Sequence, residues 1–121
     1  MNILKNILET QKNFQKSLGY DLESMNKKEK AAYIKDNILW STDELHEMLH
    51  EIPFAKDWSK KYDSWSDEKF ESQLQLSKEE YIDFLHFAFN IGLALGLTDK
   101  DIDRMFHEKN EINHTRQKVG Y

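Results

Sequence analysis

The chain contains no cysteine, and it has only one proline and four glycines in 121 residues. The absence of cysteine excludes disulfides, thiolate metal sites and cysteine nucleophiles. So little proline and glycine leaves few residues for the turns of a β-sandwich or barrel, and no useful alternating apolar run occurs. We therefore expect one all-α domain over residues 1–121, a compact bundle of about four helices without a sheet.

Long apolar runs and an excess of positive charge are also missing. No signal peptide is recognisable at the start, and the most apolar stretch, residues 81–97, is interrupted by Asp83, His86 and Asn90. These features predict a soluble, cytoplasmic protein. The formal net charge of −5 argues against a general nucleic-acid binder, although it is compatible with a nucleotide carried on metal ions.

Periodicity and capping residues predict helices over residues 2–18, 27–52, 77–97 and 98 to about 111. The expected helix ends are Gly19, Pro53 and Gly96, and the expected N-caps are Ser24 or Asn26, Ser77 and Thr98. Residues 53–76 are predicted to be irregular. This basic, aromatic stretch is either a linker held by its tryptophans or a lid over phosphate and sugar. On composition alone, the polar tail after residue 111 is a frayed terminus.

Two apolar stripes are expected to face the core. The first contains Ile3, Leu4, Ile7, Leu8, Phe14 and Leu18, and the second contains Ile34, Ile38, Leu45, Met48, Leu49 and Ile52. Gln11 and Gln15 fall inside the first stripe. Either they are satisfied locally at a helix crossing, or their planar amides recognise a planar base, because an amide offers both a donor and an acceptor.

The stretch from Tyr81 to Leu97 is so apolar that its helix is expected to be buried on nearly every side. Asp83, His86 and Asn90 recur at intervals of three and four, so they share one polar stripe on that helix. A buried carboxylate is tolerated only when it is paired, protonated or bound to a cation. The residues that face this stripe therefore decide its chemistry.

Two acid-x-x-acid pairs point to a metal site. Glu44 and Glu47 lie one turn apart on the second predicted helix, and Glu80 and Asp83 lie one turn apart on the third. If the two faces meet, they offer the hard oxygen ligands that Mg²⁺ or Mn²⁺ prefers. The alternatives are a solvated acidic face and a capping box from Ser77 to Glu80, although the latter does not account for Asp83.

A competing motif overlaps the first pair. His46, Glu47 and His50 form an H-E-x-x-H pattern, which on a helix is typical of two zinc ligands and a general base. No third ligand stands out downstream, and no strand is predicted that would hold a peptide substrate. A structural or surface role for the two histidines is therefore favoured over a zinc peptidase.

The chain resembles the all-α dUTP diphosphatases of the dimeric type, which are related to the MazG-like nucleotide pyrophosphohydrolases. Glu44, Glu47, Glu80 and Asp83 match that family's E-x-x-E and E-x-x-D motifs, and residues 80–87, EYIDFLHF, resemble the second motif closely. The closing pattern matches at Lys109, Asn110, Asn113, Arg116, Gln117, Gly120 and Tyr121. Gln11, Lys56 and Trp58 also stand where the family has a glutamine, a lysine and a tryptophan.

The resemblance implies Mg²⁺-dependent hydrolysis of dUTP to dUMP and pyrophosphate in a homodimer, with dUDP as a candidate second substrate. The four acids would hold Mg²⁺ or Mn²⁺, with Glu47 and Glu44 as the catalytic carboxylates and Glu47 orienting the water. Gln11 and then Asn90 would recognise uracil, and Trp58 or Phe87 would stack on it. The expected substrate-binding residues are Gln11, Gln15, Lys56, Trp58, Phe87, Asn90, Lys109, Asn110, Asn113 and Arg116, with the lysines and Arg116 offsetting phosphate charge.

Two departures leave the substrate open. Gln15 stands where relatives more often have Asn or Asp, and Asn90 where some have Ser. A related pyrophosphohydrolase acting on another nucleotide therefore remains an alternative, as does a non-catalytic helical interaction module.

Overall fold

The computed structural model describes residues 2–53 and 55–120, and within them it contains four α-helices and no strand. The all-α prediction is therefore confirmed. In chain order the elements are α1 (Ile3–Ser17), the short 3₁₀ helix η1 (Leu22–Ser24), α2 (Lys27–Glu51), α3 (Asp67–Ala94) and α4 (Asp99–Lys118).

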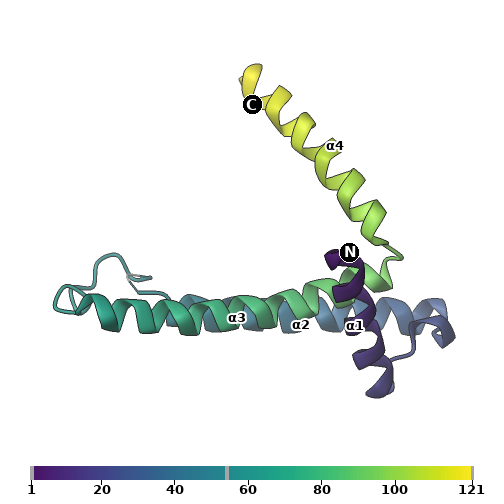
Figure 1. Cartoon of the computed structure of the whole chain (residues 1–121), viewed down its shortest axis with the longest axis horizontal. Helices are drawn as coiled ribbons and strands as arrows, with labels where there is room; N and C mark the ends of the chain where they lie inside the picture. Colours follow the sequence, from purple (N-terminus) through teal and green to yellow (C-terminus); the bar gives the residue numbers. More distant parts are fainter. Residues whose placement is uncertain (1, 54, 121) are drawn as a thin grey trace.

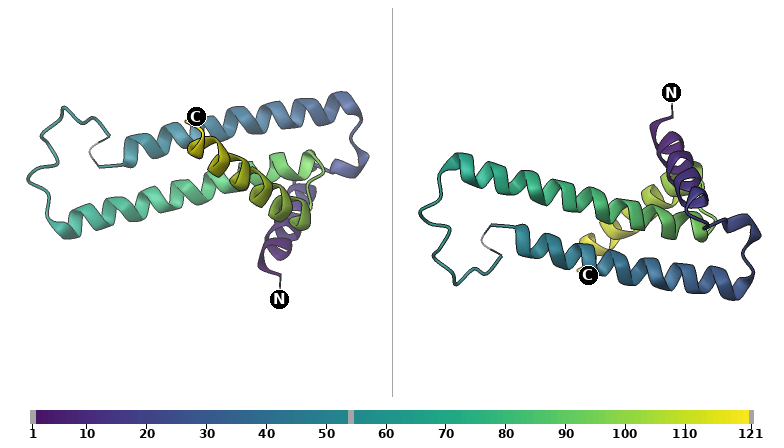
Figure 2. Two further views of the ribbon diagram at one scale, coloured as in Figure 1. Left: turned by 90° about the horizontal axis from the view of Figure 1, so that it is seen from above. Right: turned by 90° about the horizontal axis from the view of Figure 1, so that it is seen from below.

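The two longest helices, α2 and α3, run antiparallel and side by side along the length of the molecule (Figure 1). α1 crosses this pair at the end where α2 begins and α3 finishes (Figure 2). α4 turns away from α3 at an angle of 101° and projects from the pair. The loop between α2 and α3 lies at the opposite end of the pair (Figure 2).

The helix ends follow from local chemistry. Asn26 and Glu29 form a capping box at the start of α2, and Thr98 and Asp101 form another at the start of α4. α3 ends at Ala94 with Leu95 as its C-cap, and Gly96 follows with φ +82°, a conformation that glycine adopts without a Cβ penalty. Asn26, Gly96 and Thr98 therefore act as the sequence predicts.

Two predicted boundaries are wrong. α3 begins at Asp67, with the Ser66 side chain accepting a hydrogen bond from the Lys69 amide, ten residues before the expected start. Ser77 is a buried mid-helix residue whose hydroxyl donates to the Gln73 carbonyl, so it caps nothing and Glu80 belongs to no capping box. The region between Ser66 and Ser77 is helical because Ser66 supplies a cap and two acidic residues follow it in the first turn.

α4 also extends further than expected. It continues to Lys118, so the polar tail after residue 111 is helical rather than frayed. The helix has no buried residue, and its first residue is tied to the start of α1 by a 2.6 Å hydrogen bond from Asn2 Nδ2 to Asp99 Oδ2.

The faces that pack in a single chain coincide only in part with the predicted apolar stripes. Leu8 is buried as predicted, and Leu4, Ile34, Met48 and Ile52 are half-buried. The buried residues of α1 are Leu8, Gln11 and Gln15, and those of α2 are Tyr33, Asn37 and Ser41. Ile3, Ile7, Phe14 and Leu18 of the first stripe are exposed, as are Ile38, Leu45 and Leu49 of the second. Polar side chains occupy the helix crossings instead, because they bond to one another there, as described below.

Residues 81–97 are likewise not buried on every side. Tyr81 is 49% exposed and Leu95 is 61% exposed. The chain has an accessible surface of 9486 Å², whereas a compact monomer of this mass exposes about 6,900 Å². The prediction of all-round burial fails because one chain does not supply enough partners for these helices.

No single helix in residues 2–53 and 55–120 has both the length and the apolar composition for a membrane span. Only α3 and α4 taken together, across their bend, meet such a criterion.

Candidate active site

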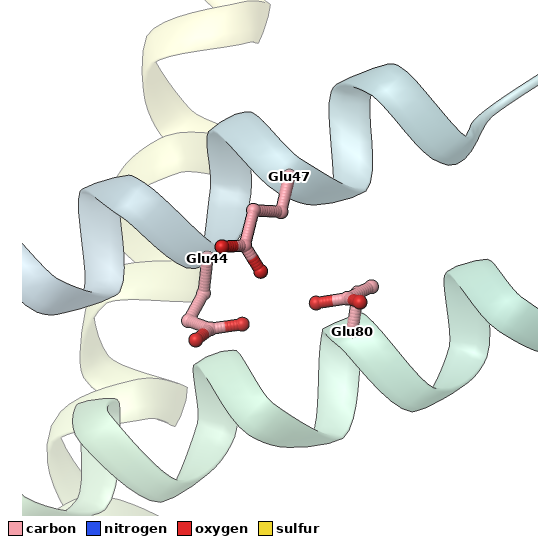
Figure 3. Close-up of side chains that lie close together, drawn as sticks. All are labelled: Glu44, Glu47 and Glu80. Carbon is pink, nitrogen blue, oxygen red and sulfur yellow. The ribbon is translucent and has the colours of Figure 1, made fainter.

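Three carboxylates meet halfway along the helical pair. Glu44 and Glu47 of α2 face Glu80 of α3, and one carboxylate oxygen of each lies within 4.8 Å of the others (Figure 3). Glu44 and Glu80 are half-buried, whereas Glu47 is exposed. The i, i+3 spacing of Glu44 and Glu47 places both on one side of α2, which explains how two residues of one helix reach the same partner.

The cluster carries more negative charge than its surroundings neutralise. Burial raises the pKa of Glu44 to about 7, and the neighbouring carboxyls of Glu80, Glu47 and Asp83 contribute in the same direction. The Oε2 atoms of Glu44 and Glu80 are buried and accept no hydrogen bond from the described residues. Such oxygens are costly unless a proton or a cation reaches them. The donor set therefore fits a divalent cation that prefers oxygen ligands.

A pocket of about 520 Å³ extends from this cluster toward α1. Glu44 and Asp83 line one end of it, and Asp83 lies beside Glu44 rather than among the three converging carboxylates. Its remaining walls come from α1, α2, α3 and the turn that follows α1, and they consist of aromatic, apolar and amide side chains: Phe14, Leu18, Tyr20, Trp40, Phe87, Gln11, Gln15, Asn37, His86 and Asn90. The pocket therefore joins an acidic end to an aromatic, hydrogen-bonding end.

Aromatic rings flank the pocket. Trp40 of α2 and Phe87 of α3 lie with ring centroids 6.1 Å apart and an interplanar angle of 54°. Such tilted rings offer a flat apolar surface on which a planar base packs.

The amide end of the pocket is a buried hydrogen-bond network. Gln11 Nε2 donates to Asn90 Oδ1 at 2.8 Å, and Asn90 Nδ2 donates to Asn37 Oδ1 at 3.0 Å. Tyr33 anchors the network through two hydrogen bonds. Asn37 Nδ2 donates to the Tyr33 carbonyl at 2.8 Å, and the Tyr33 hydroxyl donates to Gln15 Oε1 at 2.8 Å. Burial raises the pKa of Tyr33 to about 12, so its hydroxyl keeps its proton at neutral pH. Gln11 and Gln15 are thus satisfied at a helix crossing and also line the pocket, so the two interpretations of these glutamines are compatible.

Two predicted substrate residues lie outside this pocket. Lys56 and Trp58 line a separate hollow beside Leu49 and His50, in the loop that follows α2. Lys56 Nζ lies 5.7 Å from the centroid of the Trp58 ring, and Trp58 is 76% exposed. In a single chain, Lys56 therefore contacts the Trp58 ring rather than the acidic cluster.

The predicted residues of the tail also lie apart. Lys109, Asn110, Asn113 and Arg116 are exposed on α4, which points away from the α2–α3 pair (Figure 1). Tyr121 lies outside the described residues. The structure of one chain therefore gathers Gln11, Gln15, Phe87 and Asn90 around the acids, and it leaves the predicted cations elsewhere.

The histidines of the H-E-x-x-H motif bond to each other instead of to the cluster. His46 Nε2 and His50 Nε2 are 3.1 Å apart on the exposed side of α2. Among the described residues, the one group of three or more metal-binding side chains consists of glutamates, so no third ligand accompanies the pair. This arrangement favours the surface role for both histidines.

Six residues that line the pocket were not predicted as site residues: Phe14, Leu18, Tyr20, Asn37, Trp40 and His86. Tyr33, whose carbonyl accepts a hydrogen bond from Asn37, was not predicted either. Tyr33, Asn37 and Ser41 recur every four residues on α2, and this polar stripe was the available signal. The longer apolar stripe beside it masked the signal. The position of His86 on the polar stripe of α3 was recognised, but its contact with Gln11 depends on how α1 crosses and cannot be derived from spacing.

Relatives of known name match parts of the chain. A dCTP pyrophosphatase from Enterobacteria phage LZ5 is 37% identical over 71 residues, which cover 54% of this chain and 41% of the relative. A dCTP pyrophosphatase from Enterobacteria phage T4 is 37% identical over 51 residues, which cover 42% of this chain and 29% of the relative. The matches therefore span less than half the length of either relative. No solved structure matches the chain.

A sequence model of a family described as dUTPase matches residues 3–98. The matched range includes both acid pairs, the buried amide network and the aromatic walls of the pocket, and it leaves out α4 after its capping residue. The match covers well over half of the chain, so the chain belongs to the dUTPase family in its all-α form.

Proposed function

We propose that the protein is a Mg²⁺-dependent dUTP diphosphatase, which hydrolyses the α–β phosphoanhydride bond of dUTP to give dUMP and pyrophosphate, with dUDP as a second substrate. The observation that carries the proposal is the single pocket that joins Glu44 and Asp83 to an aromatic and amide-lined end. A pyrimidine nucleotide has the matching polarity, since its phosphates require cations and its base requires a flat, hydrogen-bonding surface.

Magnesium fits the acidic end because buried carboxylate oxygens there have no hydrogen-bond donor among the described residues. Glu44, Glu47 and Glu80 would hold the ion, with Asp83 beside them, and it would polarise phosphoryl oxygens and lower the pKa of a water molecule. The converging carboxylates otherwise repel an incoming triphosphate, because all of these groups are acidic.

Glu47 is our candidate for the residue that orients the attacking water. Of the three clustered glutamates it is the exposed one, so its carboxylate is within reach of solvent and of a substrate. Glu44 is the second catalytic candidate, because its raised pKa lets it hold a proton near neutral pH. At the other end, Phe87 and Trp40 would pack on the base and Gln11 and Asn90 would bond its edge.

We further propose that the working form is a homodimer. Exposed apolar residues recur along one side of α2 at Ile38, Leu45 and Leu49, and Tyr81 and Ile82 of α3 are also exposed. The accessible surface exceeds that of a compact monomer by about 2,600 Å², which is an area that obligate homodimers commonly bury. A second copy is also the simplest source of the cations that one chain keeps away from the cluster, Lys109 and Arg116 among them.

Pyrophosphate release from a panel of deoxynucleoside and ribonucleoside triphosphates tests the proposal. The purified protein is assayed with Mg²⁺ and with excess chelator. We expect dUTP to be the preferred substrate and chelation to abolish its turnover. Absence of pyrophosphate from every nucleotide would favour a non-catalytic interaction module instead.

A second candidate is dCTP pyrophosphatase activity, because two relatives at 37% identity carry that name. It predicts the same dependence on Mg²⁺ with cytosine as the preferred base. The same panel separates the two substrates directly.

A further inference from the structure

The buried amide network has a direction. Gln11 donates to Asn90, Asn90 donates to Asn37, and Asn37 donates to the backbone carbonyl of Tyr33. At the other end of this series of hydrogen bonds, Gln11 Oε1 lies 2.8 Å from His86 Nδ1. The three amide side chains are almost inaccessible to solvent, with Gln11 5%, Asn37 0% and Asn90 2% exposed. We refer to these bonds as the amide relay.

The carbonyl at the end of the relay fixes the orientation of every amide in it. A backbone carbonyl only accepts, so Asn37 must turn its nitrogen toward Tyr33 and its oxygen toward Asn90. Asn90 must then present its nitrogen to Asn37 and its oxygen to Gln11. Gln11 must in turn present its nitrogen to Asn90 and its oxygen to His86, whose Nδ1 carries the hydrogen. Reversal of Gln11 alone would set its side-chain oxygen against Asn90 Oδ1, so that two acceptors would face each other in a buried site.

The direction of the relay is aligned with the pocket. On α3, Asp83, His86 and Asn90 follow one another at successive turns away from the acidic end. Gln11 Oε1 faces His86, which is nearer to the acidic end along α3, and Gln11 Nε2 faces Asn90, which is farther from it. The amide therefore places its acceptor toward the acids and its donor away from them.

Uracil and cytosine differ in the matching groups. The phosphates must reach the acidic end, so a bound base has its sugar on that side and its 4-substituent farthest away. From near to far, uracil then presents the N3–H donor and the O4 acceptor, whereas cytosine presents the N3 acceptor and the N4–H₂ donor. The fixed acceptor and donor of Gln11 complement uracil at both positions and oppose cytosine at both.

We propose that Asn37 is a positioning residue, and that through Asn90 it locks the Gln11 amide in the orientation that selects uracil over cytosine. The proposal rests on the proposed function, because it requires a pyrimidine nucleotide in this pocket. Asn37 acts through its neighbours and sets specificity rather than the rate of bond cleavage. An amide free to rotate would pair with either base, since it offers one donor and one acceptor in both orientations.

The test compares the ratio of kcat/KM for dUTP to kcat/KM for dCTP in the full-length protein and in Asn37→Leu. Leucine has the same branching and the same number of side-chain heavy atoms as asparagine but neither accepts nor donates, so Asn90 loses the partner that fixes its orientation. The wild-type protein should favour dUTP by about 10- to 100-fold, the discrimination expected when a buried polar group is left unsatisfied. In Asn37→Leu the ratio should fall about tenfold while Mg²⁺-dependent turnover of dUTP persists.

Two further variants make the result specific. Ser41→Ala is the matched control, because Ser41 is a buried polar residue of the same face of α2 whose hydroxyl donates to the Ile38 carbonyl of its own helix. Its ratio should stay within twofold of the wild-type value. If Asn37→Leu fails to fold by circular dichroism, Asn37→Ala replaces it, because a methyl side chain also removes the acceptor for Asn90 and the donor to the Tyr33 carbonyl, without adding volume.

The outcomes separate this inference from the function on which it rests. A wild-type protein that prefers dCTP, or a folded relay variant with the wild-type ratio, overturns the role of the relay and leaves the hydrolase intact. A wild-type protein that releases no pyrophosphate from either nucleotide overturns the proposed function itself.

Discussion

Glu44 of α2 and Glu80 of α3 face each other across the helical pair, and the Oε2 atom of each is buried without a hydrogen-bond partner among the described residues. Apolar side chains at these positions would pack without electrostatic cost. The pair is therefore a site where stability is lower than the fold allows, a pattern typical of functional positions. The following predictions test what this arrangement does.

The metal-free protein should lose stability as the pH rises. The pKa of Glu44 is about 7 in the folded protein against an ordinary value of 4.5, so the folded state keeps this proton to higher pH than the unfolded chain. The free energy of unfolding should therefore fall as the pH rises from about 4.5 to about 7. In chelator at pH 8, Glu44→Gln should raise the melting temperature by about 4 °C or more.

The same variant should differ much less from the wild-type protein at pH 4.5, where Glu44 is protonated in the folded state and half protonated in the unfolded chain. Melting curves from pH 4.5 to 8 check both expectations. A Glu44→Gln protein that is less stable than wild type at pH 8 without metal would show that the clustered carboxylates do not repel one another.

Substitution of Glu47 should reduce hydrolysis without unfolding the protein. Glu47→Gln removes the charge and the basicity of the candidate water-orienting group, and kcat should fall by about 100-fold or more. Glu79→Gln is the matched control, since Glu79 is an exposed acid adjacent to Glu80 that is absent from the clustered carboxylates. Pyrophosphate release and circular dichroism on both variants measure the two effects. Equal loss of activity in both would count against a specific role for Glu47.

Charge on the exposed apolar side of α2 should separate the proposed dimer. Leu45→Glu with Leu49→Glu places two carboxylates on the side that we expect a second copy to cover, and the mass in solution should fall to that of one chain. Asp43→Lys changes a charge elsewhere around α2 and should leave the dimer intact. Light scattering after size-exclusion chromatography measures the mass. A wild-type protein that is monomeric at micromolar concentration would rule out the homodimer.

The Tyr33 hydroxyl should stabilise the crossing of α1 over α2. Tyr33→Phe leaves the buried Gln15 Oε1 without its donor, which should cost about 1–3 kcal/mol in the free energy of unfolding. Tyr20→Phe is the control, because the Tyr20 ring packs 5.4 Å from that of Tyr33 but is partly exposed. Urea denaturation gives both values. Equal costs would mean that the bond to Gln15 contributes nothing particular.

The parts of the fold that depend on local chemistry could be predicted from the sequence. The capping residues Asn26 and Thr98 and the glycine after α3 mark their helix ends, because each acts on its own backbone neighbours. The spacing of the acids also predicts which carboxylates share a helix face, and Glu44, Glu47 and Glu80 do converge.

The packing faces could not be predicted, because they depend on how the helices cross. Asn37 and Asn90 tolerate burial because Asn90 donates a hydrogen bond to Asn37 across the two helices. This bond cannot be inferred from the pattern of one helix. The apolar stripe of Ile38, Leu45 and Leu49 was assigned to the core of one chain, where it is exposed. A periodic pattern predicts that a helix face is buried, but it does not identify the element or the second chain that covers it.

The binding of a divalent cation by the clustered glutamates is the central claim, and calorimetric titration of the chelator-treated protein with Mn²⁺ tests it most directly. The wild-type protein and Glu79→Gln should bind with the same affinity, whereas Glu80→Gln should bind at least about tenfold more weakly because it lacks one ligand. Equal affinity in all three proteins, or no binding by the wild type, would contradict the account.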